Sequence, residues 1–248
     1  MVVTRGVILA AGRGTRLGSL TETVPKPLLE VAGRPVLDHI VDSMTSAGVR
    51  HLTVVTGHLA NEIERHLARS CPVPVSFVRQ DEVNGTAGAL LLVERALGHK
   101  PFMLSWGDIV TASRHYRAVA DTFEADIAGI IAVNMLEDVS SGSSVVFGED
   151  LVITDIIEKP AAPAPGQWNS SGIMIFGGAI WAHVATLRPS VRGELELSDA
   201  IRSMLASDEL LKAVKLTGEW FDIGTPETLA AAQTGFHDVA PIVGKDGR

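Results

Sequence analysis

The sequence predicts an α/β fold: a Rossmann-like, doubly wound and mostly parallel sheet flanked by helices, followed by a small β-rich portion. Through residue 133, short apolar runs rich in β-branched residues alternate with segments in which apolar residues recur at helical spacing. A glycine-rich loop follows the first apolar run. Strands that alternate with helices are typical of βαβ units, which build parallel sheets. Beyond residue 133 the alternation stops and hairpin-like strands replace it.

In the first half, strands and helices follow one another in a regular order. Continuous apolar runs predict buried strands, and apolar residues three or four positions apart predict helices. The strands are expected at residues 2–9, 51–57, 73–78, 101–105 and 127–133. The helices are expected at residues 36–47, 59–67 and 86–97.

The second half is expected to be richer in turns. Residues 143–159 read as a hairpin with a Gly-Glu-Asp turn, and residues 160–167 as a surface loop. Further elements are expected as helices near residues 179–187 and 198–206, a short strand at 220–224, and a last helix at 226–234 with proline in its first turn. We therefore expect one domain over residues 1–236, divided near residues 133 and 134, and a tail over residues 237–248.

Composition limits the classes of partner. The 248 residues carry a formal net charge of −8, and 46% of them are hydrophobic, which suits a globular α/β domain. An acidic chain is not expected to bind nucleic acid or an anionic membrane. Cys71 is the only cysteine, so an internal disulfide is excluded, and no apolar stretch approaches the roughly 20 residues of a membrane span. We therefore expect a cytoplasmic protein without a membrane or nucleic-acid partner.

The loop after the first strand, LAAGRGTRLGSLTETVPKPL at residues 9–28, combines three glycines with Arg13, Arg16 and Lys26. Glycines at this place let backbone N–H groups approach a phosphate. The loop lacks the Gly-Lys-Ser/Thr end of a P-loop, and its third glycine comes one residue late for G-x-G-x-x-G. Residues 5–34 hold five Lys or Arg against two Glu, a local charge of +3 in an acidic chain. Because these cations bind phosphate oxygens, the pattern favours a triphosphate over a dinucleotide.

Six motifs then occur in order along the chain. They are LAAGRGTRL with PKPL in the opening loop, GTAGAL at residues 85–90, GD at 107–108, EKP at 158–160, GELELSDAI at 193–201 and WFDIGTPE at 220–227. Together they closely resemble the sugar-1-phosphate nucleotidylyltransferases, of the glucose-1-phosphate thymidylyltransferase or mannose-1-phosphate guanylyltransferase type. The resemblance implies an enzyme that transfers a nucleotidyl group from a nucleoside triphosphate to a sugar 1-phosphate and releases pyrophosphate. It also implies a nucleotide-binding part over about residues 1–133, a sugar-binding part over about 134–236, and a short, single-domain form.

The same resemblance assigns charged residues to the reaction. Arg16 is expected to contact the departing pyrophosphate, and Lys26 to stabilise the α-phosphate in the transition state. Asp108 follows a strand at its carboxyl end, where ligands gather in open α/β sheets. Asp222 is an aspartate among apolar residues and therefore needs a partner. By resemblance, the two carboxylates converge on one Mg²⁺, an ion that prefers carboxylate and phosphate oxygens.

Two segments are expected to contact the nucleotide. They comprise Leu9, Ala10, Ala11, Gly12, Gly14 and Thr15 in the opening loop, and Gln80, Gly85 and Thr86 farther along. Gln80 stands where the family places a base-reading side chain, and its amide offers a donor and an acceptor, which suits uracil or thymine. UTP or dTTP is therefore the expected triphosphate. GTP is the alternative, because Asp81 or Glu82 would meet the adjacent donors of guanine and GTAGAL also resembles guanylyltransferases.

The sugar 1-phosphate is expected to contact Glu158, Lys159, Ser170, Gly172 and Glu196. By resemblance, Lys159 would hold the phosphate, and the two glutamates would accept hydrogen bonds from sugar hydroxyls. Three residues depart from the family pattern. Ser170 stands in an asparagine register, Met174 stands where an aromatic residue is common, and Trp106 is an unusual neighbour of the GD motif. These departures leave the identity of the sugar open.

Other classes remain as alternatives. A non-catalytic nucleotide-binding regulatory protein on the same fold would have no need of the two metal aspartates. A nicotinamide-linked oxidoreductase is disfavoured by the loop spacing. A phosphocholine cytidylyltransferase would need an aromatic or acidic cage for the quaternary ammonium. The oligomeric state stays open, and a homo-oligomer is one possibility.

Overall fold

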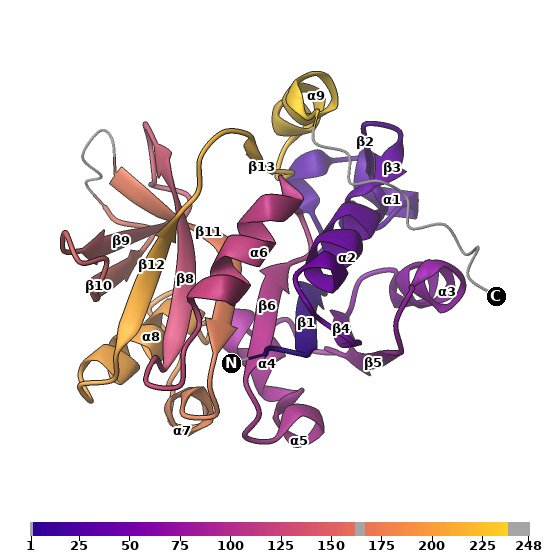
Figure 1. The fold of residues 1–248 in the computed structure, drawn as a ribbon. Coiled ribbons are helices and arrows are strands. Elements are labelled where there is room, and N and C mark those ends of the chain that lie inside the picture. The colour runs from indigo at the N-terminus through magenta and orange to yellow at the C-terminus, as the bar shows by residue number, and fades with distance from the viewer. Residues whose placement is uncertain (1, 162–166, 238–248) are drawn as a thin grey trace.

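The computed structural model describes residues 2–161 and 167–237 (Figure 1). Its central sheet contains β1 (Arg5–Ala10), β4 (His51–Thr56), β5 (Val75–Arg79), β6 (Phe102–Trp106), β8 (Gly129–Leu136), β9 (Ser143–Phe147), β10 (Ile153–Glu158), β11 (Gln167–Phe176) and β12 (Leu211–Lys215). Two small sheets contain β2 (Glu30–Val31) with β3 (Arg34–Pro35), and β7 (Ile109–Thr111) with β13 (Trp220–Asp222).

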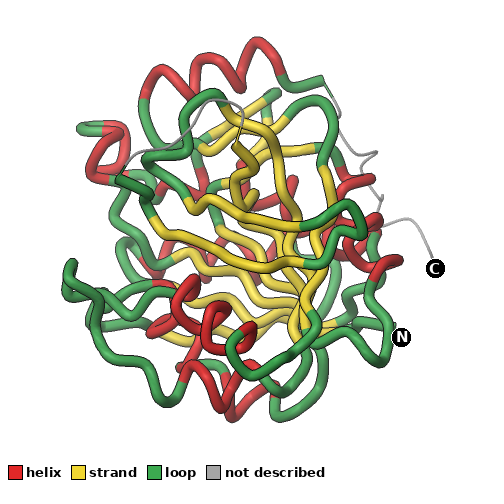
Figure 2. The backbone as a smooth tube through the Cα atoms, turned by 90° about the vertical axis from the view of Figure 1, so that its left-hand side faces the viewer, coloured by secondary structure: helices red, strands yellow, loops and turns green. Residues whose placement is uncertain are grey.

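Helices surround this sheet, and Figure 2 shows the strands gathered in the centre of the molecule. The helices are α1 (Leu20–Thr23), α2 (Val36–Ser46), α3 (Ala60–Ser70), α4 (Thr86–Leu91), α5 (Glu94–Leu97), α6 (Ser113–Thr122), α7 (Ile180–Val184), α8 (Leu197–Leu205) and α9 (Pro226–Gly235). Single 3₁₀ turns cover Thr15–Leu17 and Lys26–Leu28.

The strand order of the central sheet is β10-β9-β11-β6-β1-β4-β5, with β8 paired to β11 and β12 paired to β8. The β6-β1-β4-β5 strands are parallel to one another, and β12 is parallel to β8. β11 runs antiparallel to β6, β8 and β9, so it joins the two halves of the sheet. The predicted fold class is therefore confirmed: a mixed, mostly parallel α/β sheet with helices on both faces.

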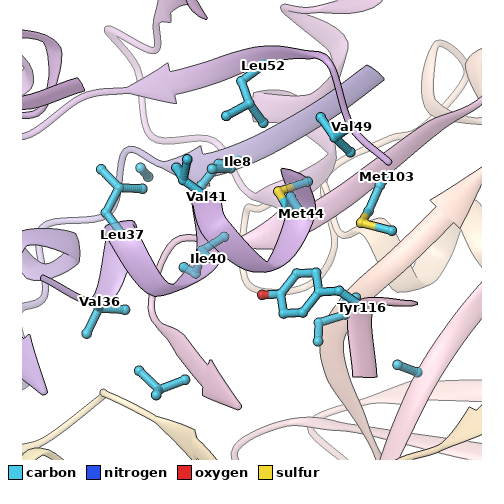
Figure 3. Packing of buried hydrophobic residues seen from close by; sticks show 14 of the residues in the cluster. Ile8, Val36, Leu37, Ile40, Val41, Met44, Val49, Leu52, Met103 and Tyr116 are labelled. Carbon is cyan, nitrogen blue, oxygen red and sulfur yellow. The ribbon is translucent and has the colours of Figure 1, made fainter. Parts of the chain in front are cut away.

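Each face of the sheet carries its own apolar core, because successive residues of a strand point to opposite faces. Ile8 lies in the core under α2 and α6, where Ile40, Met44 and Tyr116 also lie (Figure 3). Its neighbour Val7 lies in the other core, under α4, α7 and α8. The same alternation runs along β6, β8 and β11, so the two cores are built on shared strands.

The structure departs from the expected elements at several places. β1 begins at Arg5 rather than at residue 2, at the point where its pairing with β4 begins. The helix expected over residues 86–97 is two helices, because Val93 N and Ala96 N bond to carbonyls only three residues back. The sequence did not predict α6, β11 or β12. The hairpin of β9 and β10 is confirmed, as is α9 with proline at its start.

Parts of two predictions lie outside the described residues. These are the tail expected over 237–248, of which only His237 is described, and the middle of the loop expected over 160–167. Among the helices of residues 2–161 and 167–237, none is long and apolar enough to cross a membrane.

Candidate active site

A cavity of about 500 Å³ opens beside the carboxyl ends of β1 and β6. Its walls come from the opening loop, from β10, β11 and β13, and from the starts of α4, α8 and α9. The predicted site residues on its lining are Arg16, Thr86, Glu158, Lys159, Ser170, Glu196 and Asp222. These residues come from segments that are up to about two hundred positions apart in the sequence, and the fold brings them to one place.

One lysine and two aspartates form a cluster beside one end of this cavity: Asp222 lies on the lining, whereas Lys26 and Asp108 do not. Lys26 Nζ is 2.5 Å from Asp108 Oδ2 and 3.6 Å from Asp222 Oδ1. The two aspartates meet because β13 pairs with β7, which places Asp222 opposite Ile109, and Ile223 N donates to the Asp108 carbonyl at 2.9 Å. Arg16 also reaches this end: a Cβ added at Gly224 would lie 3.2 Å from Arg16 Nη2 and 3.4 Å from Asp222 Oδ1.

The charges of this cluster shift one another's pKa values. Burial acts to lower the pKa of Lys26, but Asp108 and Asp222 outweigh it and raise that pKa above its usual 10.5. Burial and then the Asp108 carboxylate raise the pKa of Asp222 to about 6, against the opposing effect of Lys26 and Arg16. Because the two carboxylates lie close together, a positive charge between them stabilises the ionised form of both.

The two aspartates fit a magnesium ion. Asp108 Oδ1 and Asp222 Oδ1 are both buried atoms without a hydrogen-bond partner. Mg²⁺ is commonly held by one or two carboxylates, with substrate phosphates and water completing its octahedron. No group of three or more His, Cys, Asp or Glu suited to a metal is found in the described part of the chain. A site here would thus depend on phosphate oxygens for its remaining ligands.

The opening loop leaves β1 and turns across the end of the sheet. Gly14 has φ of +65°, and its carbonyl accepts hydrogen bonds from Leu17 N at 2.9 Å and Thr21 Oγ1 at 3.1 Å. A Cβ added at Gly12 would meet nothing within 4 Å, and Thr15 is exposed. Before the turn, Leu9 and Ala10 end β1 and Ala11 follows it; Ala10 and Ala11 are buried and Leu9 is partly buried. The loop is thus fixed by the turn at Gly14, while Gly12 faces open space.

The opposite end of the cavity is lined by carboxylates and hydroxyls. Glu158 accepts a hydrogen bond from Ser143 Oγ, and burial, followed by the nearby Glu196, raises its pKa. Glu196 is only 4% exposed and accepts from Arg192 Nη2 at 2.8 Å. Ser143 and Arg192 were not predicted as site residues, because a single serine or arginine in a surface-like segment has no recognisable motif or spacing.

β11 lines the cavity between these two ends, and its pairing is irregular there. The β11 register shifts between Ser170 and Met174, and Gly172 has φ of +82°. A Cβ added at Gly172 would lie 2.2 Å from Trp106 Cδ1, and Trp220 Nε1 donates to the Ser171 carbonyl at 3.0 Å. Ser170 and Trp106, two of the residues that depart from the family pattern, both lie on the cavity wall.

The segment expected to read the base lies beside the cavity rather than on its lining. Gln80 is 6% exposed, and its Nε2 donates to Asn84 Oδ1 at 3.0 Å. Lys159, at the far end, has φ of +43° and donates its backbone N–H to the Gly142 carbonyl at 2.7 Å. The Thr86 hydroxyl accepts from Leu197 N at 3.0 Å, so it is already engaged with the protein.

Comparisons with known proteins agree with this architecture. The family model described as nucleotidyl transferase matches residues 5–238. The chain is 36% identical over 239 residues to the UTP–glucose-1-phosphate uridylyltransferase AglF of Haloferax volcanii, covering 90% of this chain and 92% of that protein. It is 34% identical over 228 residues to the bifunctional protein GlmU of Methanococcus aeolicus, covering 92% of this chain and 53% of that protein.

A solved structure shares the fold. The crystal structure of UDP-glucose pyrophosphorylase complexed with UDP-glucose matches with a TM-score of 0.82 at 24% identity, covering 94% of this chain and 97% of that chain. The chain thus spans nearly all of AglF and about half of GlmU.

Proposed function

Because the chain belongs to the nucleotidyl transferase family, we propose that it transfers a nucleotidyl group from a nucleoside triphosphate to a sugar 1-phosphate and releases pyrophosphate. The observation that carries this proposal is a cavity lined at one end by Arg16 and Asp222, with Lys26 and Asp108 beside Asp222, and at the other end by carboxylates and hydroxyls. Such a cavity suits two substrates that meet at their phosphates. AglF, which the chain matches over most of both lengths, is named for a reaction of this class.

In this reaction an oxygen of the sugar phosphate bonds to the α-phosphorus, and the bond from that phosphorus to the bridging oxygen breaks. The protein must align two anions that repel each other and stabilise the charge that develops. Lys26 stabilises the α-phosphate, since its ammonium lies 3.6 Å from Oδ1 of Asp222, which lines the cavity. Arg16 contacts the departing pyrophosphate from the opening loop.

The proposed cofactor is Mg²⁺, held by Asp108 and Asp222. The support for this assignment is the pair of buried carboxylate oxygens without hydrogen-bond partners. When bound, the ion neutralises phosphate charge and orients the triphosphate. The glycine backbone of the opening loop, from Gly12 to Thr15, binds the phosphates through its N–H groups.

At the other end, Lys159 holds the phosphate of the sugar, and Glu158 and Glu196 accept hydrogen bonds from sugar hydroxyls. Ser170 Oγ is buried without a partner, which suits a hydroxyl group that only a bound sugar would satisfy. For the base, we favour UTP or dTTP, read by Gln80, because its amide is held at a fixed orientation by Asn84.

The experiment is pyrophosphate release with Mg²⁺, crossing the common nucleoside triphosphates with a panel of sugar 1-phosphates. We expect one clear pair, with UTP or dTTP as the triphosphate. Asp108→Asn should reduce turnover on the order of a thousandfold, because it removes a charged metal ligand. Asp121→Asn, an exposed aspartate on α6, is the matched control and should behave as wild type. If Asp108→Asn keeps its turnover, the metal assignment is contradicted. If the wild-type protein binds a triphosphate but shows no turnover with any sugar 1-phosphate, the regulatory alternative is favoured.

A further inference from the structure

Two segments far apart in the sequence, residues 84–87 and 195–197, are joined by three hydrogen bonds. Leu195 N donates to the Asn84 carbonyl at 2.7 Å, and Ala87 N donates to the Leu195 carbonyl at 2.9 Å. Leu197 N donates to Thr86 Oγ1 at 3.0 Å. We refer to this unit as the 84–87/195–197 clamp. It ties the start of α4 to the start of α8.

The backbones of the clamp approach so closely that only glycine fits at one position. Gly85 has φ of +104°, a conformation that L side chains rarely adopt. A Cβ there would lie 2.4 Å from the Leu195 carbonyl oxygen and 2.7 Å from Leu195 N. Since both obstacles are backbone atoms, no side-chain rotation relieves the overlap. The contact is therefore a built feature of the fold and not a chance approach of two loops.

The clamp connects the proposed base reader, beside the cavity, to the sugar end of the cavity. On one side, Asn84 Oδ1 accepts from Gln80, the proposed base reader. On the other side, Glu196 lies between Leu195 and Leu197, and both of these neighbours are bonded into the clamp. Glu196 is 4% exposed and lines the sugar end of the cavity. Hydrogen bonds thus run from Gln80 through Asn84 to Leu195, the residue directly before Glu196.

We infer that Thr86 is a positioning residue, through which a bound nucleotide fixes Glu196 and raises the affinity for the sugar 1-phosphate. The inference rests on the proposed function. A nucleotide that orders the 84–87 turn also orders the backbone on both sides of Glu196, because the two segments share hydrogen bonds. The second substrate then binds to a segment that is already fixed, which gives positive coupling without a large movement. Thermodynamic linkage requires the coupling to act equally in both directions.

The first test measures amide hydrogen exchange of the full-length protein with UTP alone. We expect UTP to slow exchange in residues 84–91 and also in residues 195–205, although no sugar is present. Slower exchange at 84–91 alone would overturn the inference and leave the proposed function intact. If none of the common nucleoside triphosphates slows exchange at 84–91, the proposed function fails together with the inference.

The second test uses Thr86→Val, which removes the hydroxyl that accepts from Leu197 N, and Thr86→Ser, which keeps it. With UTP and glucose 1-phosphate as probes, we expect Thr86→Val to raise the KM for the sugar phosphate about fivefold or more and to lose the exchange effect at 195–205. The KM for UTP should change much less, and Thr86→Ser should restore wild-type behaviour. Thr122→Val, on α6, is the matched control. Equal behaviour of the valine and serine variants would overturn the inference.

Discussion

The Lys26 ammonium lies between two carboxylates that burial would otherwise leave in mutual repulsion. Replacement by methionine keeps much of the side-chain volume and removes the charge. We expect Lys26→Met to reduce pyrophosphate release by about a hundredfold to a thousandfold, because a charge aimed at the transition state is lost. Lys100→Met, at an exposed lysine, is the control for charge removal. A Lys26→Met variant that keeps a large part of its turnover would show that the ammonium serves only to hold the aspartates.

Gly172 is held in a left-handed conformation against the Trp106 indole. Gly172→Ala should therefore lower the free energy of unfolding by more than the about 1 to 3 kcal/mol of backbone strain alone, because the added Cβ also meets the ring. Gly193→Ala has a similar φ of +78° with nothing within 4 Å, so it measures the strain by itself. Urea unfolding of both variants gives the comparison. Equal losses would mean that the indole moves aside without cost.

Sequence motifs identify some site residues and not others. Motifs with a characteristic spacing and charge can be recognised from the sequence alone, and they contain Arg16, Lys26, Asp108 and Asp222. Asn84 gave no such signal. It acts through a bond to Leu195, which is 111 positions away, and no local pattern predicts which backbone groups will meet. The hydrogen bond from Leu197 N to the Thr86 hydroxyl gave no signal for the same reason, since Leu197 lies 111 positions away at the start of α8.

His39 joins α2 to β2 from a buried position, where a charged imidazole ring would be destabilising. Its Nε2–H donates to the Val31 carbonyl at 2.9 Å, and the ring is 3% exposed. Burial, with a smaller effect of Arg34, lowers the pKa of His39 below its usual 6.5, against the raising effects of the Val31 hydrogen bond, Asp38 and Asp42. Because the folded state holds the neutral ring, this stabilisation is full above pH 6.5 and is lost as the pH falls through the lowered pKa.

The measurement is the free energy of unfolding from urea titrations between about pH 7.5 and about pH 5.5. We expect wild type to lose stability over this range more steeply than His39→Gln, whose amide can donate to the same carbonyl and does not titrate. Other titrating groups are common to both proteins and cancel in the difference. Parallel curves for the two proteins would contradict the assignment.

Elements with clear patterns were predicted, and elements with mixed patterns were not. α2 and α3 carry an apolar face over a polar one, so their periodicity is plain. α6 buries only His115, Tyr116 and Val119, and because a histidine and a tyrosine make up most of this buried face, the sequence shows no apolar stripe there. β11 includes Asn-Ser-Ser-Gly, residues that seldom form strands; pairing with β8 holds Asn169 and Ser170 in the sheet, and the register shifts directly after them. In such segments, tertiary pairing overrides local preference.

The two apolar cores share the same strands, so neither face of the sheet can unfold by itself. Ile40 belongs to the core under α2, and Ile201 to the core under α8, and both side chains are buried. We expect Ile40→Ala and Ile201→Ala each to lower the free energy of unfolding by about 2 to 5 kcal/mol. Circular dichroism and tryptophan fluorescence should still report one coincident transition in each variant. Two separated transitions would show that the faces unfold independently.

The α/β class followed from the alternation of the first half, which a parallel sheet imposes on any chain that forms one. The position of β11 could not be predicted from the sequence, because strand order in a sheet depends on contacts between distant segments. β11 comes after the alternation has ended, yet it lies between β6 and β8.

That placement decides how the polypeptide would respond to being cut. A break in the segment between β8 and β9 would give two fragments, the first of which lacks β11. β6 and β8 would then each present an open row of N–H and C=O groups, which favours aggregation. Each fragment made alone should therefore be insoluble, whereas co-expression should let the second fragment insert its strand and restore the sheet. This segment is thus a natural place to divide the protein into a complementing pair.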